Sequence, residues 1–123
     1  MKDRKTMMKQ LFNIEGKVAI VTGGSRGIGA MIARGFVENG ARTYITARTE
    51  EACRATAEAL SHYGQCIAIP ADLSTLEGIH QFVQTFSNKE EQLDILVNNA
   101  GFMKSRQEYK TLSAAVEDFG EPD

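Results

Sequence analysis

A glycine-rich stretch at the end of an apolar run constrains the fold of this chain more than any other feature. Thr22 to Gly29 read TGGSRGIG, directly after VAIV and directly before a helix-like pattern, AMIARGFVENG. The VAIV run is apolar at every position, as a parallel strand buried on both faces requires. The glycines therefore lie at a strand-to-helix junction, which is the first turn of a βαβ unit.

Apolar runs of strand length alternate with helical patterns along the rest of the chain. Strands are predicted over 17–22, 42–47, 65–69 and 93–98. Helices are predicted from the glycines to Asn39, over 50–63, and from Ser74 as the N-cap to about Phe86. Each crossover is long enough for one helix, so the pattern predicts an α/β fold with a Rossmann-type, doubly wound parallel sheet.

Two of the predicted helices carry apolar residues at helical spacing, and these residues are expected to face the sheet. In the first helix they are Ile28, Ile32, Phe36 and Val37; in the last they are Leu76, Ile79, Phe82, Val83 and Phe86. Cys53 and Cys66 have neither a CxxC pairing nor histidine ligands nearby, which favours reduced core residues over a disulfide or a metal site.

The glycine stretch is either a phosphate-binding turn or a tight turn without a ligand. The first-turn amides of a helix have no internal partner, and with the helix dipole they form an anion site. Glycines permit unusual backbone conformations and close approach, and Ser25 and Arg26 would add a hydroxyl donor and a positive charge. The position between a buried strand and a helix favours binding; the glycines concerned are Gly23, Gly24, Gly27 and Gly29.

The end of the second predicted strand bears on which dinucleotide would bind. NAD-binding folds place an acidic residue there, which accepts hydrogen bonds from the ribose and would repel a 2′-phosphate. This chain has Ala47 and Arg48 instead, and a guanidinium suits a phosphate monoester. The sequence therefore favours NADP(H), although Arg48 could also be a solvated loop residue beside Glu50 and Glu51.

Composition excludes several other classes of protein. The net charge of −2 gives no footprint for nucleic acid or anionic lipid. The charged N-terminus lacks the apolar segment of a signal peptide, and no apolar run is long enough to span a bilayer. We therefore expect a cytoplasmic protein that binds neither nucleic acid nor membrane.

Four motifs in order resemble the short-chain dehydrogenase/reductase family. They are TGGSRGIG, the Ala47-Arg48 pair, the ADL at 71–73 and the NNAG at 98–101, and the resemblance covers about residues 11–101. It is nearest to NADP-preferring 3-oxoacyl reductases. The resemblance implies a sheet order of 3-2-1-4, and a reaction in which hydride passes between NADPH and a carbonyl or alcohol.

The family's roles carry over to particular positions of this sequence. The resemblance implies contacts of Gly23, Ser25, Arg26 and Ile28 with the pyrophosphate and ribose. It places Arg48 at the 2′-phosphate, Asp72 and Leu73 at the adenine, and Asn99, Ala100 and Gly101 beside the nicotinamide-side ribose, with Asn98 tying the fourth strand to the sheet. Read alone, Asp72 could instead be a helix-capping acid and NNAG a strand-ending turn.

The catalytic group of the family has no counterpart in this chain. The resemblance implies a tyrosine with a lysine four residues later and a serine, all beyond NNAG. The fourth residue after Tyr44 is Arg48, after Tyr63 it is Ile67, and after Tyr109 it is Ser113, so no YxxxK is present. No catalytic residue is assigned, and the isolated chain is expected to be inactive.

The expected organisation is an N-terminal extension over 1–12, an NADP-binding half-domain over 13–101 and a divergent tail over 102–123. The chain resembles the cofactor-binding half of a reductase, truncated after about four strands. Such a truncation would expose the edge of the fourth strand and favour self-association. Two alternatives stay open: a non-catalytic NADP-binding module, and a relic or interaction fragment that binds no cofactor.

Overall fold

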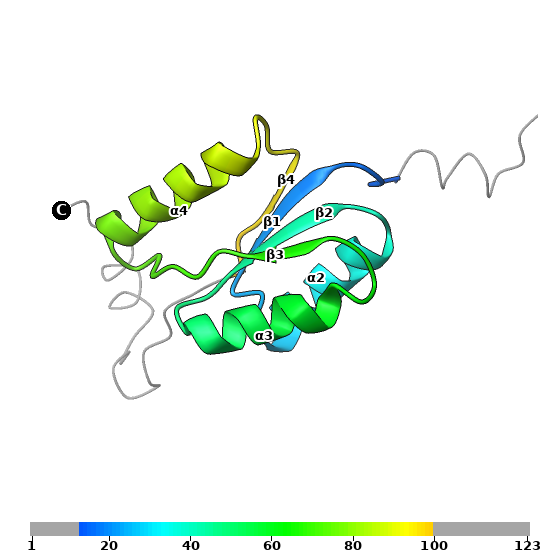
Figure 1. The fold of residues 1–123 in the computed structure, drawn as a ribbon, viewed down its shortest axis with the longest axis horizontal. Coiled ribbons are helices and arrows are strands. Elements are labelled where there is room, and N and C mark those ends of the chain that lie inside the picture. The colour runs from blue at the N-terminus through cyan, green and yellow to red at the C-terminus, as the bar shows by residue number, and fades with distance from the viewer. Residues whose placement is uncertain (1–12, 100–123) are drawn as a thin grey trace, which may run out of the picture.

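Four parallel strands form the sheet, in the order β3-β2-β1-β4, as predicted. The computed structural model describes residues 13–99, so the predictions for 1–12, Ala100, Gly101 and 102–123 lie outside the described residues. The strands are β1 Val18–Thr22, β2 Arg42–Thr46, β3 Cys66–Ala68 and β4 Ile95–Val97. The helices are α2 Gly27–Glu38, α3 Glu50–Leu60 and α4 Leu76–Lys89, and Figure 1 shows how these elements are arranged.

Most elements begin or end close to their predicted bounds, and the differences have local causes. Helix α3 ends at Leu60 instead of residue 63, because turn hydrogen bonds such as Tyr63 N to Leu60 O follow it. The N-cap of α4 is Thr75, whose hydroxyl accepts from the Gly78 amide, and the prediction of Ser74 was wrong. Ser74 instead donates its hydroxyl and its amide to the Asp72 carboxylate.

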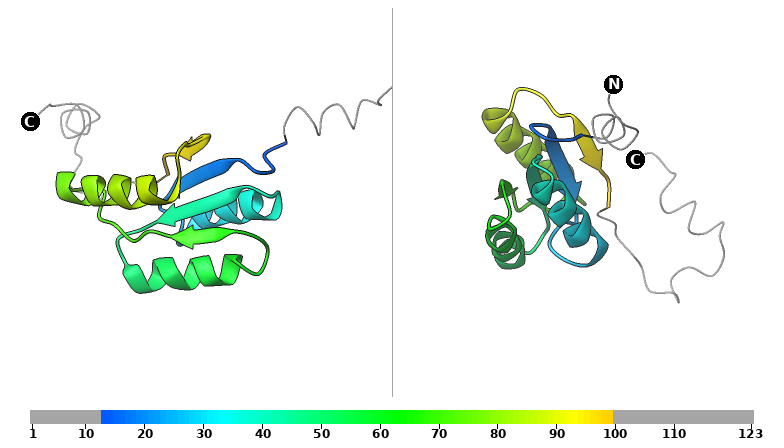
Figure 2. Two further views of the ribbon diagram at one scale, coloured as in Figure 1. Left: turned by 45° about the horizontal axis from the view of Figure 1, so that its top comes forward. Right: turned by 90° about the vertical axis from the view of Figure 1, so that its right-hand side faces the viewer.

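Helices cover both faces of the sheet, with α2 and α3 on one side and α4 on the other (Figures 1 and 2). The α2–α3 side holds a core of apolar residues that are almost fully buried: Val21, Ala33, Val37, Ile45, Cys53, Ala57, Leu60 and Cys66. Burial raises the pKa of the Cys66 thiol to about 12, so this free cysteine stays protonated near neutral pH. The α4 side holds a second core: Val18, Ile20, Tyr44, Ile69 and Phe82.

Several apolar side chains that were expected to face the sheet do not. Ile28 at the start of α2 is 70% exposed, whereas Val37 is buried and Ile32 and Phe36 pack against the first core. On α4, Phe82 and Phe86 pack against the second core, but Leu76, Ile79 and Val83 are exposed. Helix α4 carries more apolar surface than the described part of the sheet covers.

Candidate functional site

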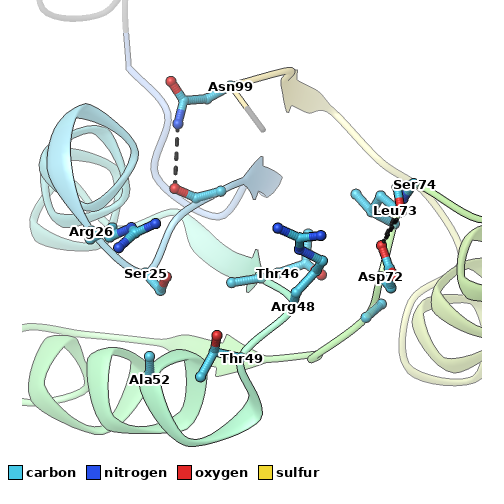
Figure 3. A pocket seen from close by; sticks show the side chains of 13 residues that line it. Ser25, Arg26, Thr46, Arg48, Thr49, Ala52, Asp72, Leu73, Ser74 and Asn99 are labelled. Atoms are coloured by element: carbon cyan, nitrogen blue, oxygen red, sulfur yellow. Dashed lines mark hydrogen bonds between the residues drawn. The ribbon is translucent and has the colours of Figure 1, made fainter. Parts of the chain in front are cut away.

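The carboxyl ends of the strands meet at one edge of the sheet, where the pocket lies. The parallel register pairs Thr22 with Thr46 and Val21 with Val97, so these strands end side by side. A pocket of about 560 Å³ opens beyond them and is drawn in Figure 3. Its lining residues are Gly23, Ser25, Arg26, Thr46, Ala47, Arg48, Thr49, Ala52, Ala71, Asp72, Leu73, Ser74 and Asn99.

We call residues 23–26 the glycine loop; its first residues are fixed to the neighbouring strand. The amides of Gly23 and Gly24 both donate to the Thr46 carbonyl oxygen, at 2.9 and 3.3 Å. Gly23 has φ 66°, a conformation that a side chain would disfavour. The chain therefore turns sharply at the end of β1 and reaches α2 along the rim of the pocket.

The loop also packs closely against the first turn of α2 and against the residue pair after β4. A Cβ on Gly29 would clash with the Gly23 carbonyl and with the Asn99 side chain. Asn99 donates its side-chain amide to that same carbonyl at 3.3 Å, and its backbone amide to the Thr22 hydroxyl at 2.9 Å. In the structure it is Asn99 whose side chain reaches the end of β1, the function expected of Asn98.

Gly24 does not have the unusual backbone conformation that was expected of it. Its φ is not positive, so its backbone needs no conformation that a side chain forbids. A Cβ there would lie 2.7 Å from Cγ2 of Ile45, and Gly24 is buried away from the pocket lining. Gly24 thus contributes to packing between the loop and β2 rather than to the pocket wall.

The N-terminus of α2 lies beside the pocket and has no side-chain cap. Arg26 is the N-cap residue, and no side chain hydrogen-bonds there as a cap. No acidic residue lies in the first helical turn. The first amides and the positive end of the helix dipole are consequently available to an anion. Ser25 and Arg26 line the pocket at this point, as Figure 3 shows.

Arg48 and Asp72 supply opposite charges to the other part of the pocket. Arg48 is exposed just beyond β2, and Asp72 lies on the segment that leads from β3 to α4 (Figure 3). Hydrogen bonds from Ser74 lower the pKa of the Asp72 carboxyl, and the positive charge of Arg48 adds to this effect. Asp72 is therefore an ionised acceptor at neutral pH, and Arg48 offers an unburied guanidinium to an anionic ligand.

Close packing against α4 fixes the position of Asp72. A Cβ on Gly78 would clash with the Asp72 carbonyl, so only glycine allows the first turn of α4 to approach this closely. The Thr75 hydroxyl donates to the same carbonyl at 3.2 Å. Sequence analysis did not identify Thr75 or Gly78 as site residues, although a glycine in a helical first turn is an unusual choice that signals close approach.

Seven of the predicted cofactor-binding residues line the pocket together: Gly23, Ser25, Arg26, Arg48, Asp72, Leu73 and Asn99. Gly24, Gly27, Ile28 and Gly29 lie in the loop or in the first turn of α2, outside the lining set. Thr46 is a lining residue that the sequence analysis missed, and its buried hydroxyl has no hydrogen-bond partner among residues 13–99. No repeating pattern in the sequence marks this threonine.

Tyr44 is a structural residue. It is 2% exposed in β2, and its hydroxyl donates to Glu90 at 2.5 Å, at the end of α4. Burial first, and then this hydrogen bond, raise the pKa of Tyr44 to about 12. Such a group holds its proton near neutral pH and does not line the pocket, so it is no candidate for a catalytic acid.

Within residues 13–99, no three histidine, cysteine or acidic side chains are grouped as metal ligands would be. In the same range, no helix combines the length and apolar character that crossing a bilayer requires.

A parallel sheet in the order β3-β2-β1-β4, with a glycine turn after β1, defines a Rossmann-type fold. The sequence model described as short chain dehydrogenase matches residues 17–119. The chain belongs to the short-chain dehydrogenase family.

Two curated relatives are named as 3-oxoacyl-[acyl-carrier-protein] reductases. The chain is 55% identical over 94 residues to the rhamnolipids biosynthesis 3-oxoacyl-[acyl-carrier-protein] reductase of Pseudomonas aeruginosa, covering 76% of this chain and 37% of the relative. It is 41% identical over 92 residues to the 3-oxoacyl-[acyl-carrier-protein] reductase FabG of Vibrio harveyi, covering 75% and 37%. The chain thus spans about 37% of the length of these relatives.

Solved structures of the family superpose on the same region. The Pseudomonas aeruginosa RhlG/NADP active-site complex matches with a TM-score of 0.72 and 56% identity, over 74% of this chain and 37% of that one. L-Sorbose reductase from Gluconobacter frateurii, complexed with NADPH and L-sorbose, matches with a TM-score of 0.71 and 32% identity, over 85% and 45%.

Proposed function

We propose that this chain is the NADP(H)-binding portion of a short-chain dehydrogenase/reductase. The observation that carries the proposal is one pocket that joins the uncapped N-terminus of α2 to Arg48 and Asp72. Its volume of about 560 Å³ lies within the range of small-molecule and cofactor sites. Similar proteins in complex with NADP or NADPH support the choice of cofactor.

In this proposal each part of the pocket binds one part of the cofactor. The pyrophosphate lies at the glycine loop and the first turn of α2, where amides and the helix dipole stabilise negative charge. Arg48 binds the 2′-phosphate, and the ionised Asp72 accepts a hydrogen bond from the adenine amino group beside Leu73. The ribose on the nicotinamide side contacts the segment that starts at Asn99. The bound cofactor would supply the hydride of the family's reaction.

Isothermal titration of the chain with NADPH and NADH tests this proposal. We expect NADPH to bind more tightly than NADH, because only NADPH carries the phosphate that Arg48 would hold. Arg48→Ala should weaken NADPH binding by about tenfold to a hundredfold and leave NADH binding almost unchanged. Arg34→Ala is a matched control, since Arg34 pairs with Glu38 on the exposed side of α2. If the unaltered chain bound NADPH and NADH with equal affinity, Arg48 would not bind the 2′-phosphate.

Catalysis separates the two remaining forms of the proposal. A cofactor-binding module binds NADPH without oxidising it, whereas a complete reductase oxidises NADPH when a ketone is added. We expect binding without turnover. The lining of the described pocket provides no proton donor, and the sequence contains no YxxxK motif. A chain that binds neither cofactor would be the non-binding fragment.

We also propose that β4 mediates self-association. It is an outer strand of the described sheet, and Leu93 and Leu96 are 40% and 56% exposed. Exposed apolar side chains beside unpaired backbone groups favour pairing with another strand. A cytoplasmic location and the absence of nucleic-acid partners stay predictions from the sequence.

A further inference from the structure

A contact between α3 and the glycine loop has no assigned function in cofactor binding. The Thr56 hydroxyl donates a hydrogen bond to the Ser25 carbonyl oxygen at 2.8 Å, across 31 positions of sequence. Thr56 is half-buried on α3 and is not one of the residues that line the pocket. We propose that Thr56 is a positioning residue, which sets the orientation of the loop's peptides for the pyrophosphate and does not touch the cofactor.

The geometry of the peptide bond explains how such a contact acts at a distance. In a trans peptide the C=O and the N–H point in opposite directions, and residues 13–99 contain no cis peptide bond. Holding the Ser25 carbonyl against α3 therefore turns the Arg26 N–H away from α3. Arg26 is the N-cap of α2, so this peptide sets the direction in which the first helical turn presents its amides.

The contacts with β2 and with Asn99 hold the first residues of the loop, and Arg26 at its end accepts a hydrogen bond from the Ala30 amide of α2. Gly23 and Gly24 donate to the Thr46 carbonyl, and Asn99 donates to the Gly23 carbonyl. The Thr56 bond lies further along, at Ser25, two residues before Gly27, which has φ 61°. A glycine-containing segment has many accessible conformations, so a fixed point in its middle removes conformations that aim the amides elsewhere.

Helix α3, which carries Thr56, is itself held in place by its packing against the core. Its buried side chains Cys53, Ala57 and Leu60 belong to the core on the α2–α3 side of the sheet. Thr56 directly precedes Ala57, which is 5% exposed. The position of the Thr56 hydroxyl is thus set by the packing of α3, and the loop conforms to it.

The inference rests on the proposed function, and it predicts a selective defect. Thr56→Val keeps the shape of the side chain and removes the hydroxyl, whereas Thr56→Ser keeps the hydroxyl. Thr56→Val should weaken NADPH binding by about fivefold to tenfold, as expected for one neutral hydrogen bond, and Thr56→Ser should stay within about twofold of the unaltered chain. Adenosine 2′-phosphate has no pyrophosphate and should bind equally to all three proteins.

Isothermal titration with NADPH and with adenosine 2′-phosphate measures these differences. Equal NADPH affinity for Thr56→Val and the unaltered chain would overturn the inference. Equal weakening for both ligands would also overturn it, since that result indicates a general loss of structure. Ser61→Ala is the matched control at the C-cap of α3, because the hydroxyl that it removes is bonded to the Ala57 and Cys66 carbonyls and not to the glycine loop.

A measurement on the free protein separates this inference from the proposed function. Amide hydrogen exchange of residues 23–28 should be faster in Thr56→Val than in Thr56→Ser or Ser61→Ala. If the unaltered chain binds no NADPH, the proposed function is wrong, and the exchange rates alone decide whether Thr56 orders the loop. Unchanged exchange in Thr56→Val would show that the Thr56 hydroxyl does not hold the loop.

Discussion

The two faces of the sheet are stabilised in different ways. On the α2–α3 face, Val21, Ile45 and Cys53 are completely buried, and the contacts are almost entirely apolar. On the α4 face, the rings of Phe82 and Phe86 stack, the Phe86 ring meets the Tyr44 ring in a T-shaped arrangement, and polar groups add to these contacts at the helix end. There Glu90 accepts from Tyr44 and pairs with Arg42.

The α2–α3 face is therefore stabilised by an extensive apolar core, whereas the α4 face depends on a few contacts. The α2–α3 face also carries the glycine loop, through β1, β2 and Thr56. The α4 face leaves Leu76, Ile79 and Val83 exposed and holds Asp72 through the first turn of α4. We therefore expect the glycine-loop side of the pocket, proposed for the pyrophosphate, to be more robust than the Asp72 side, proposed for the adenine.

The largest effect is expected from cavity formation on the α2–α3 face. Ile45→Ala should lower the free energy of unfolding by about 3–4 kcal/mol, because Ile45 is fully buried. Ile79→Ala on α4 is the matched variant and should lower it by about 1 kcal/mol at most, because Ile79 is 39% exposed. Urea unfolding of both variants measures the difference. Similar losses for the two would mean that the faces are equally packed.

The next effect concerns the polar contacts that hold the end of α4. Glu90→Ala leaves the Tyr44 hydroxyl and the Arg42 guanidinium without their partner and should lower the free energy of unfolding by about 2 kcal/mol. Glu90→Gln keeps an acceptor for Tyr44 and should lose less. Chemical denaturation measures both free energies of unfolding. A Glu90→Ala variant as stable as the unaltered chain would show that these contacts contribute no more to stability than exposed ion pairs do.

The pH dependence of the α4 face should follow Tyr44. Its pKa is raised to about 12 in the folded chain, chiefly by burial, against about 10 for an unfolded tyrosine. The folded state holds this proton more tightly, so the contribution is complete below about pH 10 and is lost as the pH rises towards 12. The stability difference between the unaltered chain and Tyr44→Phe should shrink over that interval. A difference that stays constant from pH 8 to about 11.5 would contradict this account.

The smallest effect on stability is expected at the outer strand. Leu96→Lys changes a side chain that is 56% exposed and should alter the free energy of unfolding by less than about 0.5 kcal/mol. The charge should nevertheless reduce self-association through β4, as lysine does on edge strands. Sedimentation velocity at several protein concentrations compares the two chains. If Leu96→Lys left self-association unchanged, the contact between chains would not involve β4.

Local patterns in the sequence predict a parallel α/β sheet and Arg48, while the family resemblance supplies the strand order and the positions of Asp72 and Asn99. The unbroken apolar run before Gly23 and the helix after it identify the junction, and motifs at the ends of four strands identify Arg48, Asp72 and Asn99. Their proximity follows from parallel strands, whose carboxyl ends share one edge. The functions of these residues towards a cofactor stay predictions.

The inner face of α4 could not be predicted from periodicity. Apolar residues occupy two neighbouring stripes of this helix, and the structure buries Phe82 and partly buries Phe86 while it exposes Leu76 and Val83. A hydrophobic pattern shows that a helix has apolar sides, but the sheet beneath decides which one is covered.

Contacts between distant segments were the second gap. The bond from Thr56 to Ser25 and the buried hydroxyl of Thr46 depend on how α3 and β2 meet the glycine loop. Ser74 and Thr75 are both suitable N-caps, and the Asp72 carboxylate, by engaging Ser74, leaves Thr75 for the helix. Such choices become visible only in three dimensions.

Hydrogen bonds connect β4 to β1 at both of its ends, so the length of the segment between them is fixed. Before the strand, Asp94 exchanges two hydrogen bonds with the backbone of Val18, at 2.8 and 2.9 Å. After it, Asn99 grips Thr22 and Gly23. Each residue of a strand advances the chain by about 3.3 Å, so inserting or deleting one residue between Asp94 and Asn99 would allow only one end to engage. The number of residues between Asp94 and Asn99 thus determines whether Asn99 reaches the glycine loop. A change in the length of this segment is therefore more disruptive than a change of side chain within it.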